Sequence, residues 1–112
     1  MEHLLEIAFN AALEKKAIDP VILDLRNLSG VTDFFLICSG QSQVQVRSIA
    51  DNILDKVSEY GFKLPVKEGY QTGVWVLLDF GQLVIHILQE QERQFYVLEQ
   101  LWHDAKTVEL PS

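Results

Sequence analysis

Two short segments hold residue types that enzymes use around metals and phosphates. The first is Asp79-Phe80-Gly81, which matches the metal-binding triplet of protein kinases. A kinase also needs a Gly-rich loop, a strand lysine and a catalytic loop, and a chain of 112 residues has no room for them. The triplet is therefore interpreted as a tight turn, at Phe80-Gly81, between two strands.

The second segment, Ser39-Gly40-Gln41-Ser42, lies between a predicted strand and a predicted helix, as phosphate-binding loops do. Nucleotidyl transfer would also need two or more carboxylates that converge on metal ions. Asp24 has no second acid two positions later, and Asp33 and Asp79 are isolated. We interpret the loop as helix initiation, and a small nucleotide-binding or nucleotidyltransferase-like enzyme remains the alternative function.

The histidines and the single cysteine predict neither a metal site nor a nucleophile. His3, His86 and His103 lack the spacing of a zinc site. Cys38 cannot form an intramolecular disulfide, and its apolar neighbours predict a small buried thiol. Cys38 and His86 could act together only in a shared cleft, which a central strand position argues against. The sequence thus predicts no catalytic residue, no metal and no cofactor.

Residues 73–88 predict a hairpin whose two faces differ in chemistry. One face is aliphatic and predicts core: Val74, Val76, Leu78, Leu83, Ile85 and Ile87. The other face is mixed and suggests a surface made for recognition: Trp75, Leu77, Asp79, Gln82, Val84 and His86. With a turn at Phe80-Gly81, Trp75 would lie opposite His86. Chemistry alone leaves open whether a helix covers Trp75 or whether it is an exposed interface anchor.

The surrounding elements follow from periodicity and from capping residues. Helical spacing predicts helices over 3–18, 43–60 and 91–104, with strands at 21–25 and 34–38 and a possible edge strand within 63–68. Ser42 with Gln45 fits a capping box, and Gly61 fits a left-handed helix stop. The last helix should place Arg93 and Tyr96 on its outer side and Trp102 in the core.

This order of elements predicts one α/β domain over residues 1–112, with a loose tail from about residue 105. The sheet should be mixed and mainly five-stranded, with helices packed mostly on one face. The strand-helix-strand passage through residues 34–79 predicts a right-handed parallel crossover. The opposite face of the sheet should then be partly open, and Trp75 and His86 should point toward it.

The charge balance favours a basic protein as partner. The chain has 16 acidic and 9 basic residues and a formal net charge of -7. Such a surface repels phosphate backbones, so direct nucleic-acid binding is not expected. We see no signal peptide and no apolar run near the ~20 residues of a membrane helix, so a cytoplasmic protein without membrane contact is expected.

Several longer motifs resemble the ribosomal silencing factor family, also called Iojap-related. They are Gly73-Val74-Trp75-Val76-Leu77-Leu78-Asp79-Phe80-Gly81, Val84-Ile85-His86 and the run from Arg93 to Trp102, with Asp24-Leu25, Asp33-Phe34-Phe35-Leu36-Ile37, Gln45-Val46, Ala50-Asp51 and Glu68-Gly69 upstream. The resemblance covers essentially the whole chain in the right order. Phe34 departs from the tyrosine of many members, and Gln82 departs from a common acid, so the acidic rim is weaker than in the family pattern.

The resemblance implies a fold similar to nucleotidyltransferases but without their catalytic acids. It implies binding to large-subunit ribosomal protein fourteen, at the face that meets the small subunit. Occupying that face would block subunit joining and repress translation when nutrients are scarce. The implied contact residues are Glu68, Trp75, Leu77, Asp79, Phe80, His86, Arg93 and Tyr96. A homodimer that covers Trp75 is a further expectation.

Overall fold

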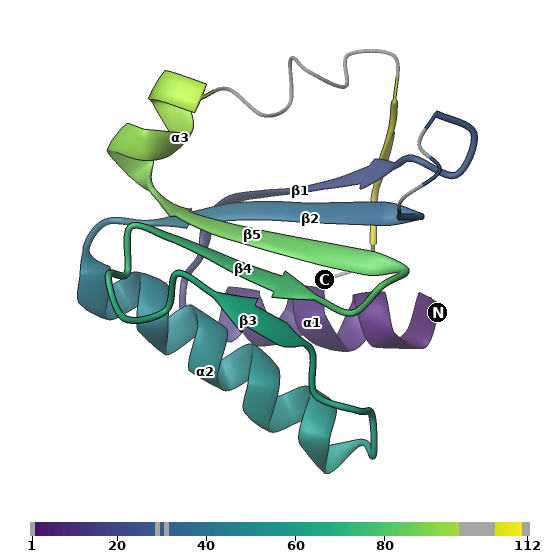
Figure 1. Ribbon diagram of the computed structural model, residues 1–112, viewed down its shortest axis with the longest axis horizontal. Helices are drawn as coiled ribbons and strands as arrows, with labels where there is room; N and C mark the ends of the chain where they lie inside the picture. The colour runs from purple at the N-terminus through teal and green to yellow at the C-terminus, as the bar shows by residue number, and fades with distance from the viewer. Residues whose placement is uncertain (1, 29, 31, 97–104, 111–112) are drawn as a thin grey trace.

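The computed structural model of the chain describes residues 2–28, 30, 32–96 and 105–110 (Figure 1). Its elements are α1 (Glu2–Glu14), β1 (Ile18–Asp24), β2 (Phe34–Gly40), α2 (Gln43–Glu59), β3 (Val66–Glu68), β4 (Trp75–Asp79), β5 (Leu83–Gln89), α3 (Glu90–Tyr96) and β6 (Lys106–Val108). The predicted helix over 91–104 is thus confirmed as far as Tyr96. Its remaining residues, Trp102 among them, lie outside the described part of the chain.

The strands form one mixed sheet in the order β3-β4-β5-β2-β1-β6. Among the strands that the structure describes, β2 and β5 pair in parallel and every other neighbouring pair is antiparallel. Helices α1 and α2 cover one face of the sheet, and the short α3 lies toward the other face at the end of β5 (Figure 1). The predicted α/β class and the packing of most helix on one face are confirmed.

The crossover that follows β2 differs in detail from the prediction. The first strand after α2 is β3, which runs parallel to β2 but lies at the edge of the sheet. The parallel neighbour of β2 is β5 rather than β4. Strand β4 runs back between β3 and β5. The hairpin of residues 73–88 therefore stands between the edge and the centre of the sheet.

Local capping explains the limits of α2. The Ser42 hydroxyl accepts a hydrogen bond from the Gln45 amide at 3.1 Å, which confirms half of the predicted capping box. The Gln45 side chain reaches back to the Gln41 amide at 2.7 Å, one residue before the expected position. Gly61 follows the helix with φ of +86°, the left-handed stop that the sequence predicts.

The core lies between the sheet and the two long helices. Val76, Leu78, Leu83, Ile85 and Ile87 from the hairpin are fully buried there, against residues such as Leu5, Ile49 and Ile53. The predicted aliphatic face is therefore a core face, with Val74 half-buried at its end. Cys38 is a free and fully buried thiol in the same core, as predicted.

The expectation of a loose tail from about residue 105 is wrong for Lys106–Val108. These three residues form β6, which pairs with β1 and makes the sheet six-stranded rather than five-stranded. Val108 and Leu110 pack against the core, so the segment gains apolar contacts as well as backbone hydrogen bonds. A three-residue strand is too short to show a period of two, and its partner lies more than 80 residues earlier.

Candidate protein-binding face

The second face of the sheet holds most of the predicted contact residues. Glu68 on β3 pairs with Leu77 on β4, and Leu77 pairs with His86 on β5. Directly paired residues of neighbouring strands project to the same side, so these three side chains form a row. A second row beside it runs from Val66 through Asp79 to Val84. These two rows thus share one face of the sheet.

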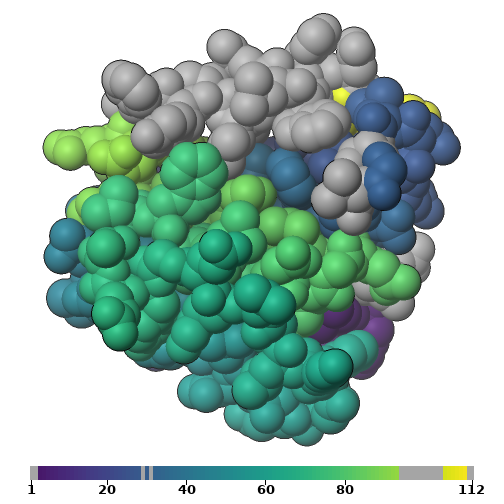
Figure 2. Space-filling model, viewed as in Figure 1, coloured from purple at the N-terminus to yellow at the C-terminus, as the bar shows by residue number. Residues whose placement is uncertain are grey.

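Exposure changes strongly along these rows. Val66 is 63% exposed, Glu68 and Asp79 are exposed, and Leu77 is half-buried. His86 and Val84 are buried at 6% and 8% exposure. Figure 2 shows the β3–β4 region on the near surface of the molecule. The predicted open face is therefore confined to the β3–β4 side of the sheet.

The β1–β2 side of the same face is a small second core. Leu23, Leu25, Ile37 and Leu88 are buried together, and Phe35 and Trp75 pack against them. Trp75 itself is half-buried. The exposure of Trp75 therefore lies between the two alternatives, a covered side chain and an exposed anchor. The indole lies at the boundary between this small core and the exposed β3–β4 surface.

The hairpin register places Trp75 diagonally from His86 rather than opposite it. Leu77 pairs with His86, and Trp75 pairs with Leu88. The turn residues are Gly81 and Gln82, because the Phe80 amide donates to the Leu83 carbonyl at 2.8 Å. The turn lies one residue later than predicted, which shifts the register by two residues. Since the side-chain period of a strand is also two, the strand residues keep their predicted faces, and Gln82 moves from the predicted strand into the turn.

Trp75 and His86 are nevertheless joined by a hydrogen bond. The indole Nε1–H donates to His86 Nδ1 at 3.2 Å. The edge of the Phe35 ring packs on the imidazole, with ring centroids 4.6 Å apart. Because Nδ1 accepts, the proton of the neutral ring is on Nε2, and this buried atom has no hydrogen-bond partner among the described residues. His86 is thus a buried residue that holds the indole of Trp75 in its orientation, and it is not exposed to solvent.

Burial lowers the pKa of His86 from 6.5 to about 4. As the pH falls below about 6.5, the unfolded chain binds a proton that the folded chain excludes, until the pH reaches about 4. We therefore expect the free energy of unfolding to drop by about 2 kcal/mol between pH 7 and pH 5 through this residue. Urea unfolding at the two pH values measures the drop.

The control for this prediction is His86→Gln, whose amide oxygen can still accept from the indole. Carboxylates titrate in both proteins, so the difference in pH dependence between them isolates the imidazole. The same loss of stability in both proteins would show that His86 is not the group responsible.

The hairpin turn gives Asp79 and Phe80 different environments. Asp79 Oδ1 accepts from the Gly81 amide at 2.7 Å, which stabilises the turn, and the side chain stays exposed. Gly81 has φ of +90°, as this turn requires. Phe80 is half-buried and packs against the core under the helices. Asp79 therefore belongs to the exposed β3–β4 surface, and Phe80 mainly anchors the turn.

Arg93 takes a structural position. Its Nη1 donates to the Ile18 carbonyl at 3.1 Å and to Ser39 Oγ at 3.2 Å. The side chain is half-buried and connects α3 with the ends of β1 and β2. Tyr96 ends α3, and its side chain lies outside the described part of the structure. The structure thus brings Glu68, Trp75, Leu77, Asp79 and His86 together on one face, and Arg93 connects α3 with β1 and β2.

Sequence reasoning missed two residues of this face. Val66 adds an exposed apolar side chain beside Glu68 and Asp79. The alternation of Leu64, Val66 and Glu68 was the available signal, and Pro65 obscured it. Gly69 has φ of +77°, and a Cβ atom there would overlap the Trp75 carbonyl oxygen. That close approach sets the position of the β3–β4 connection against the start of β4.

The groups that could resemble a nucleophile or the start of a phosphate-binding loop are buried. Burial raises the pKa of the Cys38 thiol to about 12, so the thiolate nucleophile does not form near neutral pH. Ser39 and Gly40 are buried, and a Cβ atom on Gly40 would lie 3.1 Å from the Val46 amide nitrogen. Among the described residues, no group of three or more His, Cys, Asp or Glu side chains could hold a metal ion. None of the described helices is long and apolar enough to span a membrane.

Comparison with known proteins assigns the family. The family model described as ribosomal silencing factor during starvation matches residues 1–112. The ribosomal silencing factor of Halalkalibacterium halodurans is 44% identical over 109 residues, which cover 97% of this chain and 93% of that protein. The chloroplastic protein Iojap of Zea mays is 38% identical over 101 residues, which cover 90% of this chain and 44% of that protein.

Solved structures share the fold over the full length. A crystal structure from Chromobacterium violaceum matches with a TM-score of 0.89 at 28% identity, covering 100% of this chain and 90% of that chain. A crystal structure from Bacillus halodurans matches with a TM-score of 0.86 at 42% identity, covering 98% and 100%. These matches extend over essentially the whole chain, as the motif resemblance does. The chain therefore belongs to the ribosomal silencing factor family.

Proposed function

We propose that this protein binds the large ribosomal subunit through ribosomal protein fourteen and blocks subunit joining by excluded volume. The supporting observation is the exposed β3–β4 surface, on which Val66 and Leu77 lie beside the carboxylates of Glu68 and Asp79. Trp75 lies next to it, held by the hydrogen bond to His86. Apolar side chains edged by acids suit a basic protein partner, as does the net charge of -7.

The mechanism needs an interface and no chemical step. An ordinary interface buries about 800 Å² on each partner, which the hairpin face and its surroundings would supply. A protein bound at the joining face of the large subunit would occupy space that the small subunit requires. The family is named for silencing during starvation, and the proposal accordingly places the action in the cytoplasm under nutrient limitation.

Sedimentation with isolated large subunits tests the proposal. The protein should co-sediment with large subunits but not with small subunits, and it should reduce the yield of joined ribosomes when added before mixing. Protein fourteen alone should compete for the bound protein. Normal subunit joining at saturating protein would contradict the mechanism, and a lack of competition would contradict the partner.

A second copy of this chain is the competing occupant of the same face. A homodimer that covers Trp75 would hide the indole and lower the concentration of binding-competent protein. Sedimentation velocity at several protein concentrations measures this association. If dimers form, the proportion bound to large subunits should fall as the protein concentration enters the dimeric range.

A further inference from the structure

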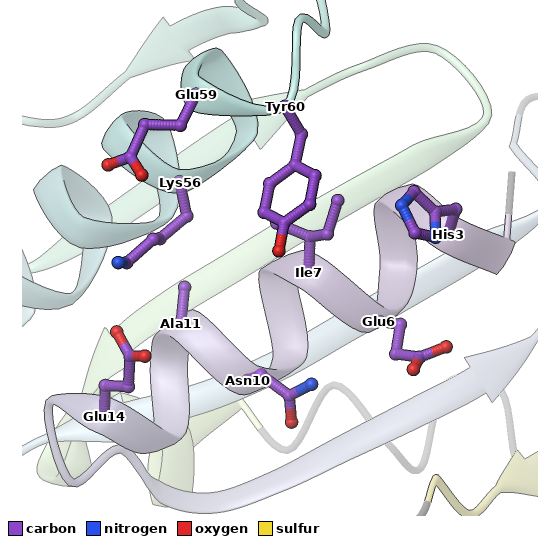
Figure 3. Close-up of a pocket in the computed structure, with 9 residues that line it drawn as sticks. All are labelled: His3, Glu6, Ile7, Asn10, Ala11, Glu14, Lys56, Glu59 and Tyr60. Atoms are coloured by element: carbon purple, nitrogen blue, oxygen red, sulfur yellow. The ribbon is translucent and has the colours of Figure 1, made fainter.

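A groove of about 240 Å³ lies between α1 and α2, on the side of these helices away from the sheet (Figure 3). One wall is a stripe of α1 from His3 to Glu14, and the other is the last turn of α2 from Lys56 to Glu59 with its C-cap residue Tyr60. The helices cover the sheet face opposite the β3–β4 surface, so a molecule in the groove would not touch the proposed ribosome-binding face. None of its lining residues has a role in the function proposed above.

The floor of the groove is apolar and its rim carries an aromatic ring. Ile7 and Ala11 line it at 9% and 2% exposure. Tyr60 is 61% exposed and stands over Ile7, with the His3 ring edge-on at 5.8 Å between centroids. A large exposed aromatic side chain beside an apolar floor can cover the aliphatic part of an incoming side chain.

The charges around the groove are predominantly negative. Glu6 and Glu14 come from α1 and Glu59 from α2, against Lys56 as the one lining lysine. Glu14 accepts a hydrogen bond from the Asn52 amide at 2.8 Å, which fixes its carboxylate. Glu6 and Glu59 have neither an ion pair nor a hydrogen bond with any residue that the structure describes. Two carboxylates, one on each wall and at opposite ends of the groove, are therefore available to cations (Figure 3).

We propose that this groove docks a short basic segment of a partner protein, with one lysine or arginine side chain directed to each of these two carboxylates. The apolar stems of these side chains would lie on Ile7 and Ala11, with one charged head at the Glu6 carboxylate and the other at the Glu59 carboxylate. The Tyr60 ring would lie between the two cations. The Asn10 amide lines the groove and can pair with backbone groups of the segment, which a simple ion would not use.

Nuclear magnetic resonance titration of the full chain tests the proposal. The probe is an acetylated hexapeptide of alternating lysine and alanine, and the control peptide has glutamine in place of lysine. The lysine peptide should shift the amide signals of Ile7, Asn10 and Ala11 and the ring signals of Tyr60. The double variant Glu6→Gln/Glu59→Gln should weaken this binding by about tenfold, since two charge-assisted contacts are lost.

A matched variant separates local from overall charge. Glu90→Gln/Glu109→Gln also removes two exposed carboxylates, outside the groove, and should change the affinity less than about twofold. Equal loss in both variants, shifts centred on the β3–β4 surface, or equally tight binding of a linear polyamine would each overturn the proposal. Co-sedimentation of Glu6→Gln/Glu59→Gln with large subunits should be unchanged. A lack of peptide binding in the groove is therefore distinguishable from a lack of ribosome binding.

Discussion

Replacement of Trp75 by Ala is expected to weaken binding to large ribosomal subunits by about 2 kcal/mol or more, which corresponds to about thirtyfold in the dissociation constant. The indole is the largest side chain at the edge of the β3–β4 surface, and the hydrogen bond to His86 holds it in one orientation. An anchor that is oriented before binding loses little freedom when the partner covers it. Titration of large subunits with labelled protein, followed by sedimentation, gives the two dissociation constants.

Two further variants make this result interpretable. Trp75→Phe keeps an aromatic ring but removes the indole donor, so it should lie between wild type and Trp75→Ala. Val44→Ala shortens a side chain that is 71% exposed on α2 and should leave binding unchanged. Because Trp75 also packs against the small second core, each variant is first checked for native circular dichroism. A folded Trp75→Ala protein with wild-type affinity would remove the indole from the proposed interface.

Replacement of Gly69 by Ala is expected to lower the free energy of unfolding by about 3 kcal/mol or more. The backbone at Gly69 has φ of +77°, which an L side chain rarely adopts. The added methyl would also overlap the carbonyl oxygen of Trp75, a backbone atom that cannot turn away as a side chain would. Relief of the overlap requires the β3–β4 connection to move. Chemical denaturation of both proteins measures the loss.

Gly61→Ala is the matched control for Gly69→Ala. Gly61 has φ of +86°, but a Cβ atom there would meet nothing within 4 Å. It should therefore show the backbone strain alone, about 1 kcal/mol. The difference between the two variants measures the steric overlap. If both variants lose the same stability, the close approach at Trp75 does not constrain the folded chain.

The sequence predicted the elements whose signals are local. A strand period of two assigned Val76 and Trp75 to opposite faces, and that assignment survived a register error of two residues. Ser42 and Gly61 marked the ends of α2 because capping depends on neighbouring residues. The same periodicity placed Leu77 and Asp79 on the side that carries Trp75, and the family resemblance added Glu68, which pairs with Leu77.

The features that the sequence did not predict depend on distant parts of the chain. The sequence favoured a partly covered His86 over a ligand, but its near-complete burial, at 6% exposure, is a property of the packed sheet. Arg93 has the spacing of an outer helix residue, yet it donates to groups more than 50 residues earlier. Strand β6 pairs with β1 across most of the chain length. A three-residue strand is too short to show the alternation of polar and apolar residues from which a strand is predicted.

The pairing of β1 with β6 has a consequence for the order of folding during synthesis. Strand β1 finds its first neighbour, β2, early, but its other edge receives β6 only after residues 106–108 have been made. Until then, the backbone amides and carbonyls of Ile22 to Asp24 form an open edge. An open edge can pair with the wrong strand or with another nascent chain. Pairing of β6 replaces this open edge with that of a three-residue strand, and short edge strands are less prone to mispairing.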